Sequence, residues 1–236
     1  MVRRATTEAL GTAFLLMAVV GSGIMGERLA GGNIAIAILA NSVATGAALV
    51  ALILAFGPIS GAHFNPAVTL ADAMQGGIAW REVPAYMVAQ VVGAFGGVAA
   101  AHVMFGLPLF FASHHVRNGG AQLWSEFIAT FGLLAVIWGC SRARSSAVPF
   151  AVGAYITAAY WFTASTSFAN PAVTLARAAS DTFAGIRPID APGFIVAQLA
   201  GAATAILFFR WLLRSSPASS MRTEVAEASQ SNHADE

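Results

Sequence analysis

The sequence predicts an all-α membrane protein with six transmembrane helices, two short re-entrant half-helices and an internal inverted repeat. Three observations predict this fold class: the composition, the spacing of long apolar runs and a duplicated heptapeptide. Of the 236 residues, 57% are hydrophobic and only 10% are charged, and the mean hydropathy is +0.70. A soluble domain carries roughly a quarter charged residues. A chain with so few charged residues therefore cannot cover the surface of a water-soluble globule with polar side chains.

The composition also excludes several other classes of protein. Cys140 is the only cysteine, which excludes a disulfide scaffold, and the high apolar content excludes a disordered chain. All twelve basic residues are arginine, and the formal net charge of +1 gives no general attraction to nucleic acid. The sequence shows no nucleophile–base pair or cluster of metal ligands, so we expect no enzyme activity, no cofactor and no metal site.

Six apolar runs have the length of about 20 residues that a helix needs to cross a bilayer. They cover residues 6–26, 34–55, 83–104, 122–140, 148–166 and 191–213. The first run has no clear cleavage site, so we interpret it as a retained helix and not as a signal peptide. The composition becomes polar after Arg214, which predicts a disordered cytoplasmic tail over 215–236.

The placement of the arginines predicts the orientation of the chain, because cytoplasmic loops are enriched in basic residues. With the N-terminus inside, eight arginines lie in inner segments and four in outer segments. Arg142 and Arg144, in the short loop SRARSS, are the clearest signal. We therefore expect a multi-pass protein of the cell inner (plasma) membrane with both termini in the cytoplasm.

Two further apolar segments, 63–74 and 168–179, are too short to span a membrane. Both contain the heptapeptide NPAVTLA, at 65–71 and again at 170–176. An identity of seven residues at matching places predicts a tandem duplication. Each copy carries three spanning runs, and an odd number places the second copy upside down relative to the first. Inverted repeats with interrupted segments indicate a site near the bilayer midplane.

Two weaker echoes support the duplication. AQVVGA at 89–94 corresponds to AQLAGA at 197–202, and Glu8 in EALGTAF corresponds to Glu126 in EFIATFG. We therefore predict one domain over 1–214, built from repeats over about 5–110 and 120–214.

The sequence Asn-Pro at the start of a short apolar run is a favourable helix start. Asn suits the N-cap, and Pro suits the first helical position because its missing N–H would be unpaired there. Each segment therefore predicts a half-helix that begins at Asn65 or Asn170. The inverted repeat brings the two positive helix ends together, which disfavours cations between them. We expect each Asn amide to direct N–H donors into this gap, where they would bind an oxygen of a neutral polar solute.

These residues resemble those of the major intrinsic protein family of aquaporins and aquaglyceroporins. The resemblance rests on the two Asn-Pro-Ala boxes, on Glu8 and Glu126 in the first helix of each repeat, and on the segment SGAHFNPAVT. It extends over about residues 5–214. It implies a homotetramer with one pore per protomer and passive conduction of water or small uncharged solutes. The boxes that it places in the pore are Asn65, Pro66, Ala67, Asn170, Pro171 and Ala172. It also implies a structural role for Glu8 and Glu126, as acceptors of backbone hydrogen bonds from the re-entrant loops.

The sequence departs from the family pattern at the outer constriction, the selectivity filter. Most members carry an arginine directly after the second box, where this chain has Val173, and the next arginine is Arg177. The other filter positions carry over by counting to Thr45, to Ser167 and to either Tyr160 or Ala158, of which we favour Tyr160. His63 is expected to line the inner vestibule. Arg177 is expected either in the outer vestibule or paired with a loop carbonyl or Asp181.

A filter of Thr, Ser and Val is wider and less polar than one that contains arginine. The resemblance therefore points to an aquaglyceroporin-like channel for glycerol, arsenite or related metalloid hydroxides, with some water. A water-selective aquaporin is the alternative. A secondary active transporter is disfavoured, because coupling needs ionisable groups at the midplane and the sequence places two asparagines there. The partners that we expect are small neutral solutes, water and lipid.

Overall fold

The computed structural model describes residues 1–212, so the predicted tail lies outside the described part of the chain. A compact unit runs over Met1–Ile206, and a second unit begins at Leu207. The α-helices are α1 (Val2–Leu29), α2 (Ile34–Ser60), α3 (Pro66–Met74), α4 (Val83–Met104), α5 (Gly120–Ala143), α6 (Val148–Phe162), α7 (Pro171–Arg177) and α8 (Ala191–Leu212). Two 3-10 turns, η1 (Trp80–Glu82) and η2 (Ser145–Ala147), precede α4 and α6. Over residues 1–212 the only β-structure is an isolated bridge between Phe111 and Ser180.

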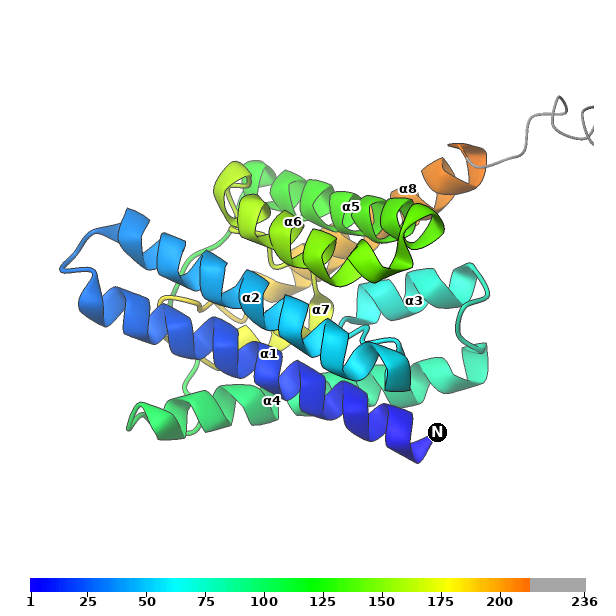
Figure 1. The fold of residues 1–236 in the computed structure, drawn as a ribbon. Coiled ribbons are helices and arrows are strands. Elements are labelled where there is room, and N and C mark those ends of the chain that lie inside the picture. The colour runs from blue at the N-terminus through cyan, green and yellow to red at the C-terminus, as the bar shows by residue number, and fades with distance from the viewer. Residues whose placement is uncertain (213–236) are drawn as a thin grey trace, which may run out of the picture. The chain divides into compact units, whose positions relative to one another are not determined.

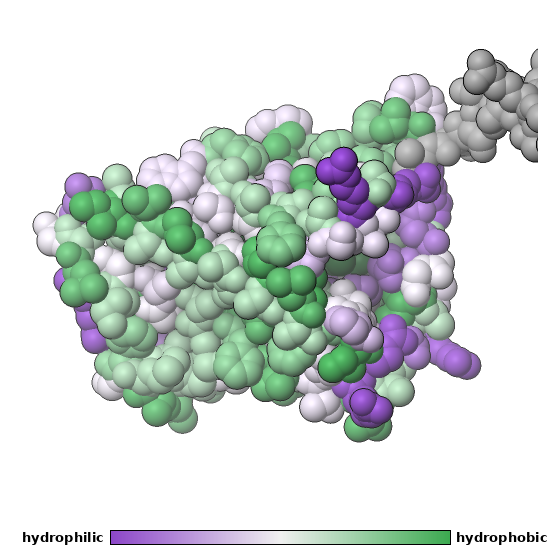
Figure 2. Space-filling model, viewed as in Figure 1, coloured by the Kyte–Doolittle hydropathy of each residue, from purple (hydrophilic) through white to green (hydrophobic). Residues whose placement is uncertain are grey.

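The predicted all-α membrane architecture is confirmed. Within the described residues, five helical segments are long and apolar enough to cross a membrane: Val2–Leu29, Ile34–Ser60, Trp80–Met104, Gly120–Ala143 and Ala191–Leu212. Figure 2 shows broad apolar surface over the sides of the helices, while hydrophilic side chains gather at the end that carries the N-terminus. This distribution suits a protein whose sides face lipid and whose ends face water.

The run predicted over 148–166 is shorter in the structure, since α6 ends at Phe162. Its 15 residues rise about 22 Å, which is less than the hydrocarbon core of about 30 Å. The Thr163 hydroxyl donates to the carbonyl of Ala159, and the backbone then becomes extended. The residues that follow, up to Asn170, form a loop that leads into α7.

Small residues allow the long helices to approach closely. A Cβ added at Gly93 or Gly97 of α4 would overlap with the backbone carbonyl of Ala9 or Ala13 of α1. In the second repeat, a Cβ at Gly201 would overlap with the carbonyl of Phe127 of α5. Figure 1 shows α1 lying along α4. The repeat therefore appears in the helix packing as well as in the sequence, as is typical of membrane helices.

Candidate functional site

The N-termini of α3 and α7 meet inside the helix bundle. Asn65 and Asn170 are the N-caps, and their side-chain oxygens accept hydrogen bonds from the backbone N–H of Ala67 (2.9 Å) and Ala172 (3.0 Å). Each Asn Nδ2 donates to the opposite loop: Asn65 to the carbonyl of Ala169 (2.7 Å), and Asn170 to that of Phe64 (2.8 Å). One hydrogen of each amide therefore joins the two repeats, and the other is left as a donor for a solute.

Both loops that lead into the half-helices have left-handed backbone at equivalent positions. Ala62 and Phe64 have φ of 50° and 48°, and Ser167 and Ala169 have φ of 52° and 48°. Such conformations cost of order 1–3 kcal/mol each and persist only where the surroundings hold them.

Two buried carboxylates hold these loops. Glu8 accepts hydrogen bonds from the N–H of His63 (3.0 Å) and Phe64 (2.7 Å). Glu126 accepts from the N–H of Phe168 (2.9 Å) and Ala169 (2.8 Å). Neither carboxylate is exposed. Each satisfies backbone groups that would otherwise be unpaired in the membrane, which is the condition for tolerating a re-entrant loop.

Two glutamines complete this arrangement, and our sequence reasoning missed their role. Gln90 Nε2 donates to Glu8 (2.8 Å) and to the hydroxyl of Thr69 (2.8 Å). Gln198 Nε2 makes the equivalent bonds to Glu126 (2.6 Å) and Thr174 (2.8 Å). The signal was present in the echo between AQVVGA and AQLAGA, because the shared Gln is its one polar residue.

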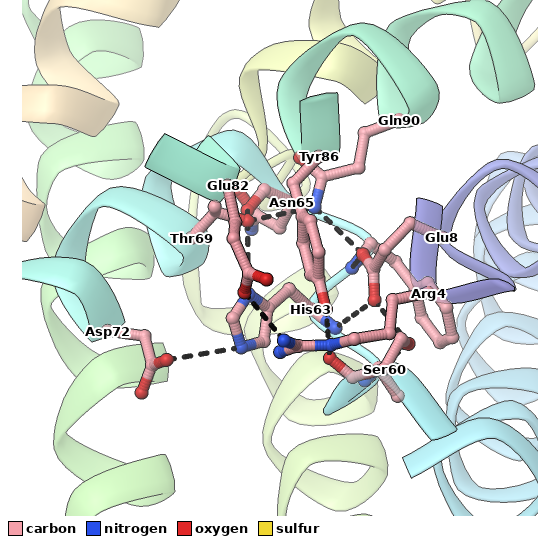
Figure 3. A network of polar contacts seen from close by, with 12 residues as sticks. Arg4, Glu8, Ser60, His63, Asn65, Thr69, Asp72, Glu82, Tyr86 and Gln90 are labelled. Carbon is pink, nitrogen blue, oxygen red and sulfur yellow. Dashed lines mark hydrogen bonds and ion pairs between the residues drawn. The ribbon is translucent and has the colours of Figure 1, made fainter. Parts of the chain in front are cut away.

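Figure 3 shows the polar network on the α3 side of the asparagines. The His63 ring lies between Thr69 Oγ1 (3.1 Å from Nδ1) and Asp72 (3.5 Å from Nε2). Arg4 forms an ion pair with Glu82 at 2.6 Å. The network therefore combines residues of α1, α3, η1 and α4 with the loop between α2 and α3, and His63 of that loop lines the cavity.

A cavity of about 520 Å³ passes between the repeats. It begins among Arg4, His63 and Asp72, passes Asn65 and Asn170, and extends to the residues of the predicted filter. Glu8 and Glu126 do not line it. The walls near the asparagines are largely aliphatic, from side chains such as Val68, Leu133 and Ile156. A neutral polar solute would meet only a few hydrogen-bonding groups along this path.

All four residues predicted for the filter border the same cavity. Thr45, Tyr160, Ser167 and Val173 all line it and are all buried. The hydroxyl oxygens of Thr45 and Tyr160 lie 3.2 Å apart. Ser167 Oγ has no hydrogen-bond partner in the described structure, so it is available to a solute. Ala158, the alternative to Tyr160, is exposed and does not line the cavity.

Arg177 also lines the cavity, and its side chain is only 2% exposed. Its Nε donates to the carbonyl of Ala184, and its Cζ lies 3.3 Å from the centre of the Phe168 ring. The structure therefore has the pairing with a loop carbonyl, one of the predicted alternatives. It does not have the pairing with Asp181, because Asp181 binds the ring and backbone N–H of His114 at 2.8 Å each.

Charged side chains link the loop between α4 and α5 to the loops around α7. Arg117 Nε donates to the carbonyl of Gly185 (2.8 Å), and its Nη1 donates to that of Ser165 (3.0 Å). Burial lowers the pKa of Arg117 to about 10, so the guanidinium remains charged at neutral pH. The backbone and side-chain hydrogen bonds from His114 lower the pKa of Asp181. These contacts connect residues 113–117 with the loops on either side of α7.

Asn170→Asp tests whether the amide hydrogens of Asn65 and Asn170, at the junction where the N-termini of α3 and α7 meet, exclude cations. Aspartate remains a good N-cap, but it replaces the N–H donor to Phe64 with an anionic acceptor. We expect a weaker junction and an increased conductance for protons and small cations. A pH-sensitive dye inside proteoliposomes measures this leak.

Asn33→Asp is the matched control, because Asn33 caps α2 in the same way but is exposed. It should behave as wild type. A folded Asn170→Asp variant with wild-type proton leak would show that this amide does not contribute to the barrier.

Comparisons with known proteins identify relatives of this chain. The family model described as "Major intrinsic protein" matches residues 1–163 and 140–235. The chain is 56% identical over 214 residues to aquaglyceroporin AqpS of Rhizobium meliloti (strain 1021), covering 91% of each chain. It is 36% identical over 180 residues to aquaporin NIP1-3 of Oryza sativa subsp. japonica, covering 73% of this chain and 62% of the relative. The fold matches the X-ray structure of the aquaglyceroporin from Plasmodium falciparum with a TM-score of 0.69, at 23% identity over 88% of this chain and 95% of that one.

Proposed function

The chain belongs to the major intrinsic protein family and is a membrane channel for small neutral solutes, and we propose that its solutes are glycerol-sized polyols and trivalent arsenite, together with water. It is not an enzyme. One observation carries the choice of solute. At the predicted filter the cavity is lined by Val173 where most family members have arginine, and by the unpartnered hydroxyl of Ser167. A small apolar wall leaves room for a solute larger than water, and a free hydroxyl can bind its oxygen atoms.

The asparagine junction suits a passive channel. Between the inner network and the filter, the polar groups of the cavity are amides and hydroxyls, and the nearby carboxylates Glu8 and Glu126 are fully engaged by backbone and glutamine N–H groups. A coupled transporter would need an accessible ionisable group there to bind the driving ion. We therefore expect transport that follows the solute gradient and does not saturate.

Stopped-flow light scattering on proteoliposomes tests the proposal. Vesicles are challenged in turn with an impermeant osmolyte, glycerol and arsenite, and protein-free vesicles are the control. We expect flux of all three permeants: water, glycerol and arsenite. Water flux without glycerol or arsenite flux would identify a water-selective aquaporin. Proton-dependent uptake against a gradient would identify a transporter.

We further propose a homotetramer in the inner membrane, with both termini in the cytoplasm. The arginine distribution supports this orientation, and the exposed apolar side chains of α2 and α4, such as Ile36, Leu39, Val88 and Val92, support extensive contact with lipid or with other copies. Light scattering of the purified protein tests the assembly. Labelling of single cysteines introduced near residues 118 and 145 tests the orientation, since these loops should be accessible from opposite sides.

Mercuric ion is expected not to block the flux. Cys140 lies on α5, is only partly exposed and does not line the cavity, whereas Ser167 does. Ser167→Cys in a Cys140→Ser background should therefore make the flux mercury-sensitive. Block of the wild-type channel that disappears in Cys140→Ser would show that Cys140 controls the pore, contrary to this assignment.

A further inference from the structure

A positively charged side chain, that of Arg177, lines the outer end of the cavity, and it does not stand at the filter position. Val173 and Arg177 both lie on α7 and both line the cavity, one helical turn or about 6 Å apart. Val173 offers only methyl groups. Arg177 offers a guanidinium, which is the group that most family members place at position 173.

Contacts on two sides hold the Arg177 guanidinium. Its Nε donates to the carbonyl of Ala184, in the loop that follows α7. Its Cζ lies over the ring of Phe168, 3.3 Å from the ring centre. Phe168 directly follows Ser167 of the filter, so the guanidinium reaches back from the end of α7 toward the filter loop.

The Arg177 guanidinium has no carboxylate partner within ion-pair distance among residues 1–212. Asp181, four residues later in the chain, binds His114 instead. The Arg117 guanidinium also lies over the Phe168 ring, with Cζ 5.0 Å from the ring centre. A buried charge without a counter-ion is costly unless other groups solvate it. Arg177 lines the cavity, so water and solute in the cavity would supply this solvation.

We propose that Arg177 replaces the missing filter arginine from one turn further out and determines which solutes enter. The outer constriction then has two levels. At the first, Arg177 excludes protons and cations by its charge and orients hydroxylated solutes through its free N–H donors. At the second, Val173, Thr45 and Ser167 leave a wide opening. This inference rests on the proposed function, because it explains how a channel wide enough for polyols retains a barrier to cations.

Proton leak and glycerol flux in proteoliposomes test the role of Arg177 in three variants. Arg177→Met removes the charge and the donors but keeps the length of the side chain. We expect its proton leak to rise at least about tenfold, while its glycerol flux continues. Arg177→Gln, which keeps donors without charge, should also leak. Arg177→Lys, which keeps the charge but loses the planar group, should have the same low proton leak as the wild type.

Arg28→Met is the matched control, because Arg28 is an outer-side arginine that is exposed and does not line the cavity. It should match wild type in both assays. A folded Arg177→Met or Arg177→Gln variant with wild-type proton leak would overturn the inference. Failure of all three Arg177 variants to fold would also overturn it, in favour of a purely structural role. Absence of glycerol and arsenite flux in wild type would overturn the proposed function instead, and the proton-leak comparison would still decide the role of Arg177.

Discussion

Glu126→Gln is expected to lower the free energy of unfolding by at least about 3 kcal/mol. The Glu126 carboxylate accepts hydrogen bonds from the N–H groups of Phe168 and Ala169 and from Nε2 of Gln198, all in the buried interior. Glutamine has the same shape but presents an NH₂ group where an acceptor is needed. At least one donor would then lose its partner, beside backbone that is already held at a positive φ. The thermal unfolding of the detergent-solubilised protein, followed by size-exclusion chromatography, measures the effect.

Glu27→Gln is the control for this substitution, because Glu27 is exposed near the end of α1. It should unfold at the wild-type temperature. Glu8→Gln should resemble Glu126→Gln, because Glu8 occupies the equivalent place in the first repeat and accepts four hydrogen bonds. Wild-type stability in both Glu8→Gln and Glu126→Gln would show that these carboxylates do not hold the loops.

Val173→Arg is expected to reduce glycerol and arsenite flux at least about tenfold while water flux remains measurable. Val173 is buried and lines the cavity beside Ser167, Tyr160 and Thr45. Arginine adds a long side chain with five N–H donors and a permanent charge. It would narrow the opening and would also place a second cation one turn from Arg177. Stopped-flow measurements with each solute give the ratio of the permeabilities.

Val173→Thr is the matched control, since threonine has nearly the same volume as valine and should preserve large-solute flux. The double variant Val173→Arg with Arg177→Ala should recover part of the flux if both arginines share the constriction. If Val173→Arg folds, reaches the membrane and passes large solutes as before, residue 173 does not limit the opening.

Some features of the molecule follow from local sequence. The half-helices begin where Asn-Pro was expected to start them, because an Asn side chain satisfies N–H groups only two or three residues away and Pro fixes the next φ. The all-α membrane architecture could also be predicted, since the length and hydropathy of each run are local properties. The end of α6 could not, because residues 163–166 (Thr-Ala-Ser-Thr) are small and uncharged and include no Gly or Pro to stop the helix. The extended loop that replaces it is held by distant donors and acceptors, such as Ser125 and Arg117.

The sequence by itself determined the duplicated architecture, the two Asn-Pro half-helix starts, the paired carboxylates and the residue types at the filter. Only the tertiary structure decided which groups meet. The amide of Asn65 binds a carbonyl 104 residues away, the side chain of Gln198 binds a carboxylate 72 residues away, and Arg177 turns to Ala184 and Phe168 and not to Asp181. The physical reason is that capping and hydropathy act within one or two helical turns. The partner of a long polar side chain, in contrast, depends on which unpaired groups the packed helices bring within hydrogen-bonding distance.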